Sequence, residues 1–172
     1  DRADGGACPL YIAARNGRAD TVRALVERGA DVNHAKVNGA TPLIGAAVDG
    51  HADVVKVLIE NSVDVNQTNN DGGTPVSFAS QYGHTAALRL LIENNADVNR
   101  AKSDGATPVY VASECGQTGA LTILIENGGD VKQGRDNGCT PVYVAAEHGQ
   151  TGALAILIEN GGDVKQGRDN GC

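Results

Sequence analysis

The apolar residues of this chain fall into short runs that come in pairs. One pair covers residues 42–48, which are mostly small and apolar, and residues 53–61, which contain several valines with a leucine and an isoleucine. We expect a helix over each of them, Pro42–Val48 and Asp53–Asn61. Neither helix is long enough to be stable alone in water, so each must be buried against neighbouring elements.

Polar residues and glycines mark where these two helices start and stop. Thr41 can cap the first helix with its hydroxyl, and Pro42 then occupies the first helical position, where a missing N–H costs nothing. Gly50 permits a tight stop before the second helix. The dipeptide Asn38-Gly39 suits the tip of an extended hairpin. The pattern therefore predicts a unit made of helix, turn, helix and hairpin.

The same pattern returns at a constant step along the chain, and such a repeat decides the fold class. All five prolines keep this step, at Pro9, Pro42, Pro75, Pro108 and Pro141. Residues 107–139 and 140–172, each the length of one repeat, are identical at 30 of 33 positions, which indicates recent duplication or deliberate copying of a module. We expect one domain over residues 1–172, with five units at approximately 4–36, 37–69, 70–102, 103–135 and 136–168.

Units that cannot fold alone must stack on one another in a quasi-one-dimensional array. The second unit resembles the ankyrin repeat, and the resemblance extends over essentially the whole chain. The segments that carry it are Thr41-Pro42-Leu43, Ala46-Ala47, Gly50-His51, Val54-Val55-x-Val57-Leu58-Ile59 and Asp64-Val65-Asn66. The resemblance implies an all-α fold, an ankyrin-repeat α-solenoid of stacked helix-turn-helix units with short β-hairpin or loop fingers. The fingers and the first helices would line a concave groove.

The chain departs from the family pattern at several positions. The histidine that usually follows Thr-Pro-Leu is replaced in every unit, by Tyr11, Ile44, Ser77, Tyr110 and Tyr143. In the family this histidine ties neighbouring loops by hydrogen bonds, which Ile44 cannot donate, so we expect weaker tethering around the second unit. Cys8 replaces the capping threonine of the first unit, which predicts a poorer cap there. Lys132 and Lys165 stand where earlier units carry asparagine.

Composition narrows the classes of function. Lys and Arg number 14 against 21 Asp and Glu, which gives a formal net charge of −7. An acidic chain is a poor binder of phosphate backbones, so we expect no nucleic-acid partner. No apolar run approaches the roughly 20 residues of a membrane span, so we expect no membrane insertion.

The last unit is nearly the same as its predecessor, whereas solenoids normally end in capping units with a polar outer face. We therefore expect this segment to come from a longer repeat array. We expect a monomer, with end-to-end association allowed by uncapped terminal repeats.

No motif for catalysis stands out. The cysteines are Cys8, Cys115, Cys139 and Cys172, and they include no C-x-x-C pair. Stacked helices lie about 8–10 Å apart, too far for a disulfide, so we expect reduced thiols and an intracellular protein, cytoplasmic or nuclear.

Cys115 could be a reactive thiol, but its unit offers no base. No Cys/His cluster has metal-ligand spacing. We expect no enzyme activity, no metal and no other cofactor.

Two interpretations remain open for Asn33, Asn66 and Asn99. Their surroundings are similar to the ankyrin segments that asparaginyl hydroxylases modify. The alternative is that each asparagine fixes its hairpin by side-chain hydrogen bonds.

Function should then lie on the groove surface, at positions that usually contact partners in the ankyrin family and that vary here between otherwise similar units. At the hairpin tips these are Val37, Asn38, Asn70, Asp71, Ser103, Asp104, Asp136 and Asn137. At the ends of the first helices they are Val48, Asp49, Gln81, Tyr82, Glu114, Cys115, Glu147 and His148.

These residues predict a non-catalytic protein–protein interaction module, a scaffold or adaptor. Tyr82 is the best single anchor, because large amphipathic rings are enriched at binding hot spots. Six carboxylates would make the groove acidic and favour another protein or peptide that carries Lys or Arg. They belong to Asp49, Asp71, Asp104, Glu114, Asp136 and Glu147. The alternative function is a structural spacer or spring segment of a larger ankyrin array, without its own partner.

Overall fold

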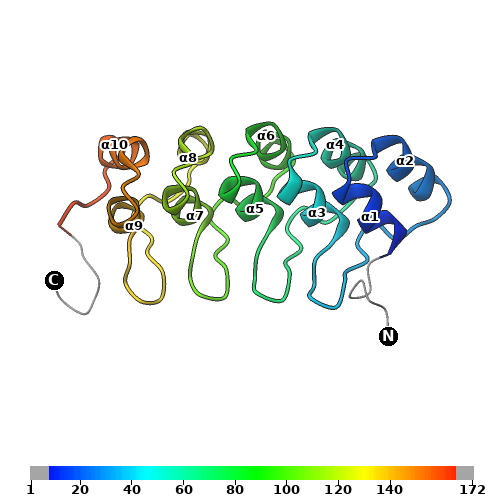
Figure 1. Ribbon diagram of the computed structural model, residues 1–172, viewed down its shortest axis with the longest axis horizontal. Coiled ribbons are helices and arrows are strands. Elements are labelled where there is room, and N and C mark those ends of the chain that lie inside the picture. The colour runs from blue at the N-terminus through cyan, green and yellow to red at the C-terminus, as the bar shows by residue number, and fades with distance from the viewer. Residues whose placement is uncertain (1–7, 166–172) are drawn as a thin grey trace.

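The computed structural model describes residues 8–165, which form a row of ten helices arranged as five pairs in chain order (Figure 1). The first helices of the pairs are α1 (Pro9–Arg15), α3 (Pro42–Asp49), α5 (Pro75–Gln81), α7 (Pro108–Glu114) and α9 (Pro141–Glu147). The second helices are α2 (Ala19–Glu27), α4 (Ala52–Glu60), α6 (Thr85–Glu93), α8 (Thr118–Glu126) and α10 (Thr151–Glu159). Each helix packs against its pair partner and against the corresponding helix of the next pair. The array is therefore an all-helical solenoid of two layers. The repeat period predicted the stacking of units, and the resemblance to ankyrin repeats implied the all-α solenoid.

Local sequence signals start and stop the helices. The Thr41 hydroxyl accepts the backbone N–H of Ile44 at 3.2 Å, and Gly50 ends α3 in the left-handed region with φ of 76°. Both features were predicted, and the observed bounds of α3 and α4 differ from the predicted ones by a single residue at some ends. In the first unit the Cys8 thiol accepts the N–H of Tyr11 at 3.4 Å, and sulfur is a weaker acceptor than a hydroxyl.

The core is a continuous stack rather than a single centre. One leucine of each second helix is fully buried from α4 onwards, at Leu58, Leu91, Leu124 and Leu157. An alanine at the same position of each first helix from α3 onwards is fully buried too, at Ala46, Ala79, Ala112 and Ala145. Small residues let neighbouring helices approach closely, which explains how a chain with 3% aromatic residues packs well.

The segments between pairs are loops on one side of the array, and residues 8–165 contain no β-strand. Each loop is closed by a backbone bond such as that from Lys102 N to the Ala106 carbonyl, 2.9 Å. Neighbouring tips are joined by one further bond, for example from Ser103 N to the Asp71 carbonyl, also 2.9 Å. The predicted fingers are thus present as loops, because one bond per tip is too little to make a strand.

Side-chain bonds connect successive units in a ladder. The side-chain oxygens of Asn33, Asn66 and Asn99 accept the backbone N–H of the aspartate 31 residues later, at 2.8–2.9 Å. The rings of His51 and His84 contact a carbonyl at the end of the preceding first helix, at 3.0 Å. These bonds support the structural interpretation of both residue types.

The asparagine ladder stops at Lys132, whose side chain cannot accept a hydrogen bond. The interruption therefore lies between the last two described pairs. It does not lie at the second unit, where weaker tethering was predicted: there Ile44 is buried and packs with Tyr11 and Phe78.

We expect Asn66→Ala to lower the free energy of unfolding by about 0.5–1.5 kcal/mol, because the Asp97 N–H loses its acceptor. Lys132→Asn should raise it by up to about 1 kcal/mol, because the new side chain can accept the N–H of Asp163. Lys132→Ala is the matched control and should change little. Urea unfolding measures all three. Equal stability of the Asn and Ala variants at position 132 would show that the ladder does not stabilise the array.

Candidate partner-binding surface

The predicted site residues form two rows, because units that repeat by one step bring equivalent positions side by side. The tip row consists of the loop-tip residues Val37, Asn38, Asn70, Asp71, Ser103, Asp104, Asp136 and Asn137. The helix-end row consists of Val48, Asp49, Gln81, Tyr82, Glu114, Cys115, Glu147 and His148, at the C-terminal ends of α3, α5, α7 and α9. Each row thus runs from one unit to the next along the solenoid.

The tip row is held by its own backbone. Asn70 donates its N–H to the Asn38 carbonyl and its side-chain amide to the Val37 carbonyl, both at 3.0 Å. The Val37 side chain stays 80% exposed, which is unusual for a branched apolar residue. The tips therefore present fixed positions to solvent.

Two of the six predicted acidic residues are already paired with arginine. The Asp49 carboxylate lies 3.3 Å from the Arg15 guanidinium, and the Asp104 carboxylate pairs with Arg135. The other four form no ion pair with any residue of 8–165, and they are Asp71, Glu114, Asp136 and Glu147. The surface is therefore less acidic than the sequence suggested.

Arg135, in the loop between α8 and α9, contacts both Asp104 and Tyr110. Its guanidinium lies 5.3 Å from the centre of the Tyr110 ring, a cation–π distance. Lys36 stands 4.7 Å from the centre of the Tyr11 ring in the same way. Sequence reasoning missed these contacts, although the tyrosine and the cation have the same separation along the chain in both cases and this shared spacing was a usable signal.

Arg135 also changes the acidity of its partner. Partial burial acts to raise the pKa of Asp104, but the Ala106 N–H and the Arg135 charge outweigh it and hold that pKa below its ordinary value. Burial raises the pKa of the Tyr110 hydroxyl, with Arg135 opposing it. Asp104 is therefore an ionised, internally neutralised residue.

Tyr82 is the most prominent residue of the helix-end row. Its side chain is 47% exposed, and its ring lies 6.2 Å from the His84 ring, centre to centre. His84 is itself bound to the Val48 carbonyl, so it supports the tyrosine from the neighbouring turn. Tyr82 therefore presents a large ring to solvent, and the neighbouring His84 ring holds it in place.

Cys115 lacks the features of a nucleophile. Burial, and next the Glu114 carboxylate, raise the pKa of its thiol, whereas reactive cysteines have a lowered pKa. His148, predicted as a groove contact, holds the Val144 carbonyl of its own helix at 3.0 Å. No group of three metal-ligating side chains occurs in residues 8–165. Cys172 lies outside the described residues.

Comparison with protein-family models finds ankyrin repeats in three overlapping copies, at residues 10–102, 49–135 and 99–168. The chain belongs to the ankyrin-repeat family. Comparison with curated proteins finds no match. Ankyrin repeats generally act as protein–protein interaction modules and are typically non-enzymatic. None of the helices within residues 8–165 is both long and apolar enough to cross a membrane.

The lowered pKa of Asp104 predicts a pH dependence of stability. Its ionised form stabilises the fold above the unfolded pKa of about 4, and this contribution disappears as pH falls through the lower folded pKa. We expect Asp104→Asn and Arg135→Gln to lose less stability than the parent on acidification. The parent should lose less than about 1 kcal/mol more free energy of unfolding than either variant, because the Asp104–Arg135 pair is partly exposed.

Urea unfolding at several pH values from neutral to acidic measures this effect. Lys102→Gln is the matched control, because Lys102 is the smallest of the influences that lower the pKa of Asp104. This variant should keep a dependence of stability on pH that is close to that of the parent. Parallel curves for the parent, Asp104→Asn and Arg135→Gln would mean that the Asp104–Arg135 pair contributes no pH-dependent stability.

Proposed function

We propose that this chain is a non-catalytic scaffold or adaptor module that binds a partner protein through the tip row and the helix-end row. The observation that carries the proposal is the half-exposed ring of Tyr82, held in a row whose residues differ from unit to unit. The buried alanines and leucines beneath the row keep their identity. Variation confined to a fixed, exposed surface is what a recognition surface needs.

The charges of the two rows support a partner segment that carries Lys or Arg. The carboxylates without an ion pair in residues 8–165 include Glu114 and Glu147, on the same side of Tyr82 along the array. Asp49, on the other side of Tyr82, is neutralised by Arg15. A basic segment would thus place its cations over the later units and an apolar or cationic group on Tyr82.

In this proposal residues 1–172 are one intracellular domain of five repeats with the predicted boundaries. The domain binds its partner as a monomer and needs no nucleic acid, membrane or cofactor. Asn33, Asn66 and Asn99 serve the inter-unit ladder, since their side-chain oxygens already hold a backbone N–H.

Binding is tested by capturing partners on the immobilised chain and titrating the recovered protein against variants. We expect Tyr82→Ala to weaken binding about tenfold or more, because truncating a central aromatic anchor costs at least about 1.4 kcal/mol. Glu114→Lys should weaken it and reduce its salt dependence, because a steering charge is reversed.

Arg89→Ala is the matched control, because Arg89 is an exposed residue of α6 outside both rows. It should bind like the parent. A partner retained equally by Tyr82→Ala, Glu114→Lys and Arg89→Ala would contradict binding through the two rows. The absence of any partner at micromolar concentration would favour the spacer function instead.

A further inference from the structure

The third repeat presents two aromatic rings on one face of α5. Tyr82 donates its backbone N–H to the carbonyl of Phe78 at 3.1 Å, so the two side chains lie one helical turn apart on the same face. Phe78 is the only phenylalanine of the chain. Phe78 and Val48 of the preceding repeat are partly exposed, and both pack against the cluster that contains Ile44. We call Val48, Phe78 and Tyr82 the aromatic patch.

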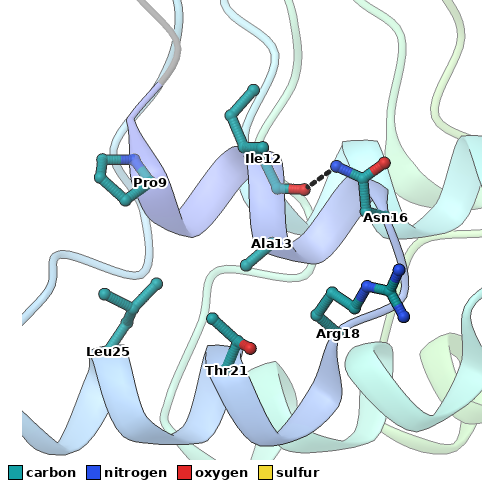
Figure 2. Close-up of a pocket in the computed structure, with 7 residues that line it drawn as sticks. All are labelled: Pro9, Ile12, Ala13, Asn16, Arg18, Thr21 and Leu25. Carbon is teal, nitrogen blue, oxygen red and sulfur yellow. Dashed lines mark hydrogen bonds between the residues drawn. The ribbon is translucent and has the colours of Figure 1, made fainter.

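The position of Phe78 points away from the second helix of its repeat. Figure 2 shows this direction in the first repeat, where Ile12, the equivalent of Phe78, projects away from α2 while Ala13 projects toward it. The repeats on either side of Phe78 have Gly45 and Val111 at this position, and both are buried. Phe78 is therefore larger than both of these neighbours and stays partly open to solvent in the middle of the array.

A carboxylate without an ion pair in residues 8–165 lies one repeat further on. It belongs to Glu114, which ends α7 as Gln81 ends α5. On the other side of the patch, the Asp49 carboxylate lies 3.3 Å from the Arg15 guanidinium, which shows that side chains at neighbouring first-helix ends reach one another. The aromatic patch thus has an unpaired negative charge towards α7 and a neutralised one on its other side.

The spacing between repeats favours one conformation of a bound segment. Packed helices lie about 8–10 Å apart. A polyproline II segment has about three residues per turn and rises about 3.1 Å per residue, so side chains three positions apart share a face at a separation of about 9 Å. Side chains on one face of a β-strand are separated by about 6.6 Å or about 13 Å, because they alternate between faces. Polyproline II therefore matches the repeat and a β-strand does not.

An α-helix matches the surface less well in chemistry. Its side chains seven positions apart share a face at about 10.5 Å, but its contact side is an apolar stripe with further residues three and four positions on. Beside the aromatic patch the helix-end row continues with Gln81 and Glu114, which would place such a stripe against polar groups.

We propose that the aromatic patch and Glu114 bind a polyproline II segment of the partner protein. An apolar side chain of the segment lies on the patch, and a Lys or Arg three residues away lies at the Glu114 carboxylate. Aromatic surfaces suit such segments, because the preformed polyproline II helix loses little conformational entropy on binding. This inference rests on the proposed function and specifies the conformation and the chemistry of the partner.

Synthetic peptides titrated into the isotope-labelled chain, with NMR chemical shifts as the readout, test the spacing. Each peptide is a serine decamer with one leucine and one arginine, set two, three or four residues apart in both orders. We expect the three-residue spacing, in one of the two orders, to bind at least about threefold more tightly than the other spacings, because only it places both side chains on one face at the repeat distance.

A second comparison tests the conformation. The two serines between leucine and arginine are replaced by two prolines, which hold polyproline II, or by two glycines, which do not. The proline peptide should bind at least about threefold more tightly than the glycine peptide, because less conformational entropy is lost.

Variants of the chain connect the peptide to the residues. Glu114→Gln should abolish the preference for the three-residue spacing, and Tyr82→Ala should weaken binding of every peptide. Phe78→Leu removes the ring but keeps an apolar side chain on its cluster, and it should weaken binding of the proline peptide. Glu126→Gln is the matched control, because Glu126 is an exposed carboxylate at the end of α8 outside both rows, and it should change nothing. Circular dichroism checks that each variant is folded.

Equal affinity at all spacings, or tighter binding of the glycine peptide, would overturn the proposal. Tighter binding of a helical peptide with leucine and arginine seven residues apart would identify an α-helix as the occupant instead. If no peptide binds while a captured partner protein still depends on Tyr82 and Glu114, the polyproline II inference fails and the proposed function stands. If the captured partner is also insensitive to both substitutions, both fail.

Discussion

Burial between neighbours is the constraint on which this structure depends. A pair of seven- to nine-residue helices cannot cover its own apolar surface, so each pair is stable only against the next one. The buried columns of alanine in the first helices and leucine in the second helices are the physical form of this dependence. Because both columns lie at contacts between units, stability and regular spacing arise from the same residues.

Polar groups then set the register that packing alone would leave loose. In the first three units an asparagine side chain joins the unit to the loop after the second helix of the next one. Two histidines join the start of a second helix to the end of the preceding first helix. In the last two units lysine and glutamine replace these residues. The Gln150 amide still reaches the Glu114 carbonyl, at 3.3 Å, so the last joint keeps part of the polar connection.

The sequence was sufficient to predict the fold because each signal is local or strictly periodic. Thr41, Pro42 and Gly50 mark helix ends by their own chemistry, and the recurrence at a constant step determines how units follow one another. The rows of candidate site residues follow from the same recurrence.

The charge state of the surface could not be predicted in this way. Whether Asp49 meets Arg15 depends on side chains from two units reaching each other in space. Only the tyrosine–cation contacts could have been predicted from the sequence, because the tyrosine and the cation are the same number of residues apart in both pairs.

The interrupted asparagine ladder has a mechanical consequence. If the chain is pulled from its two ends, the load passes through every joint in series, and a joint without the asparagine bond resists it with one polar connection fewer. That joint lies after Lys132, where the side chain cannot hold the next loop. Under tension the pair α9 and α10 would depend on the bond from the Gln150 amide to the Glu114 carbonyl and on the tip bond from Asp136 N to the Asp104 carbonyl. The first four pairs are held to one another by asparagine as well.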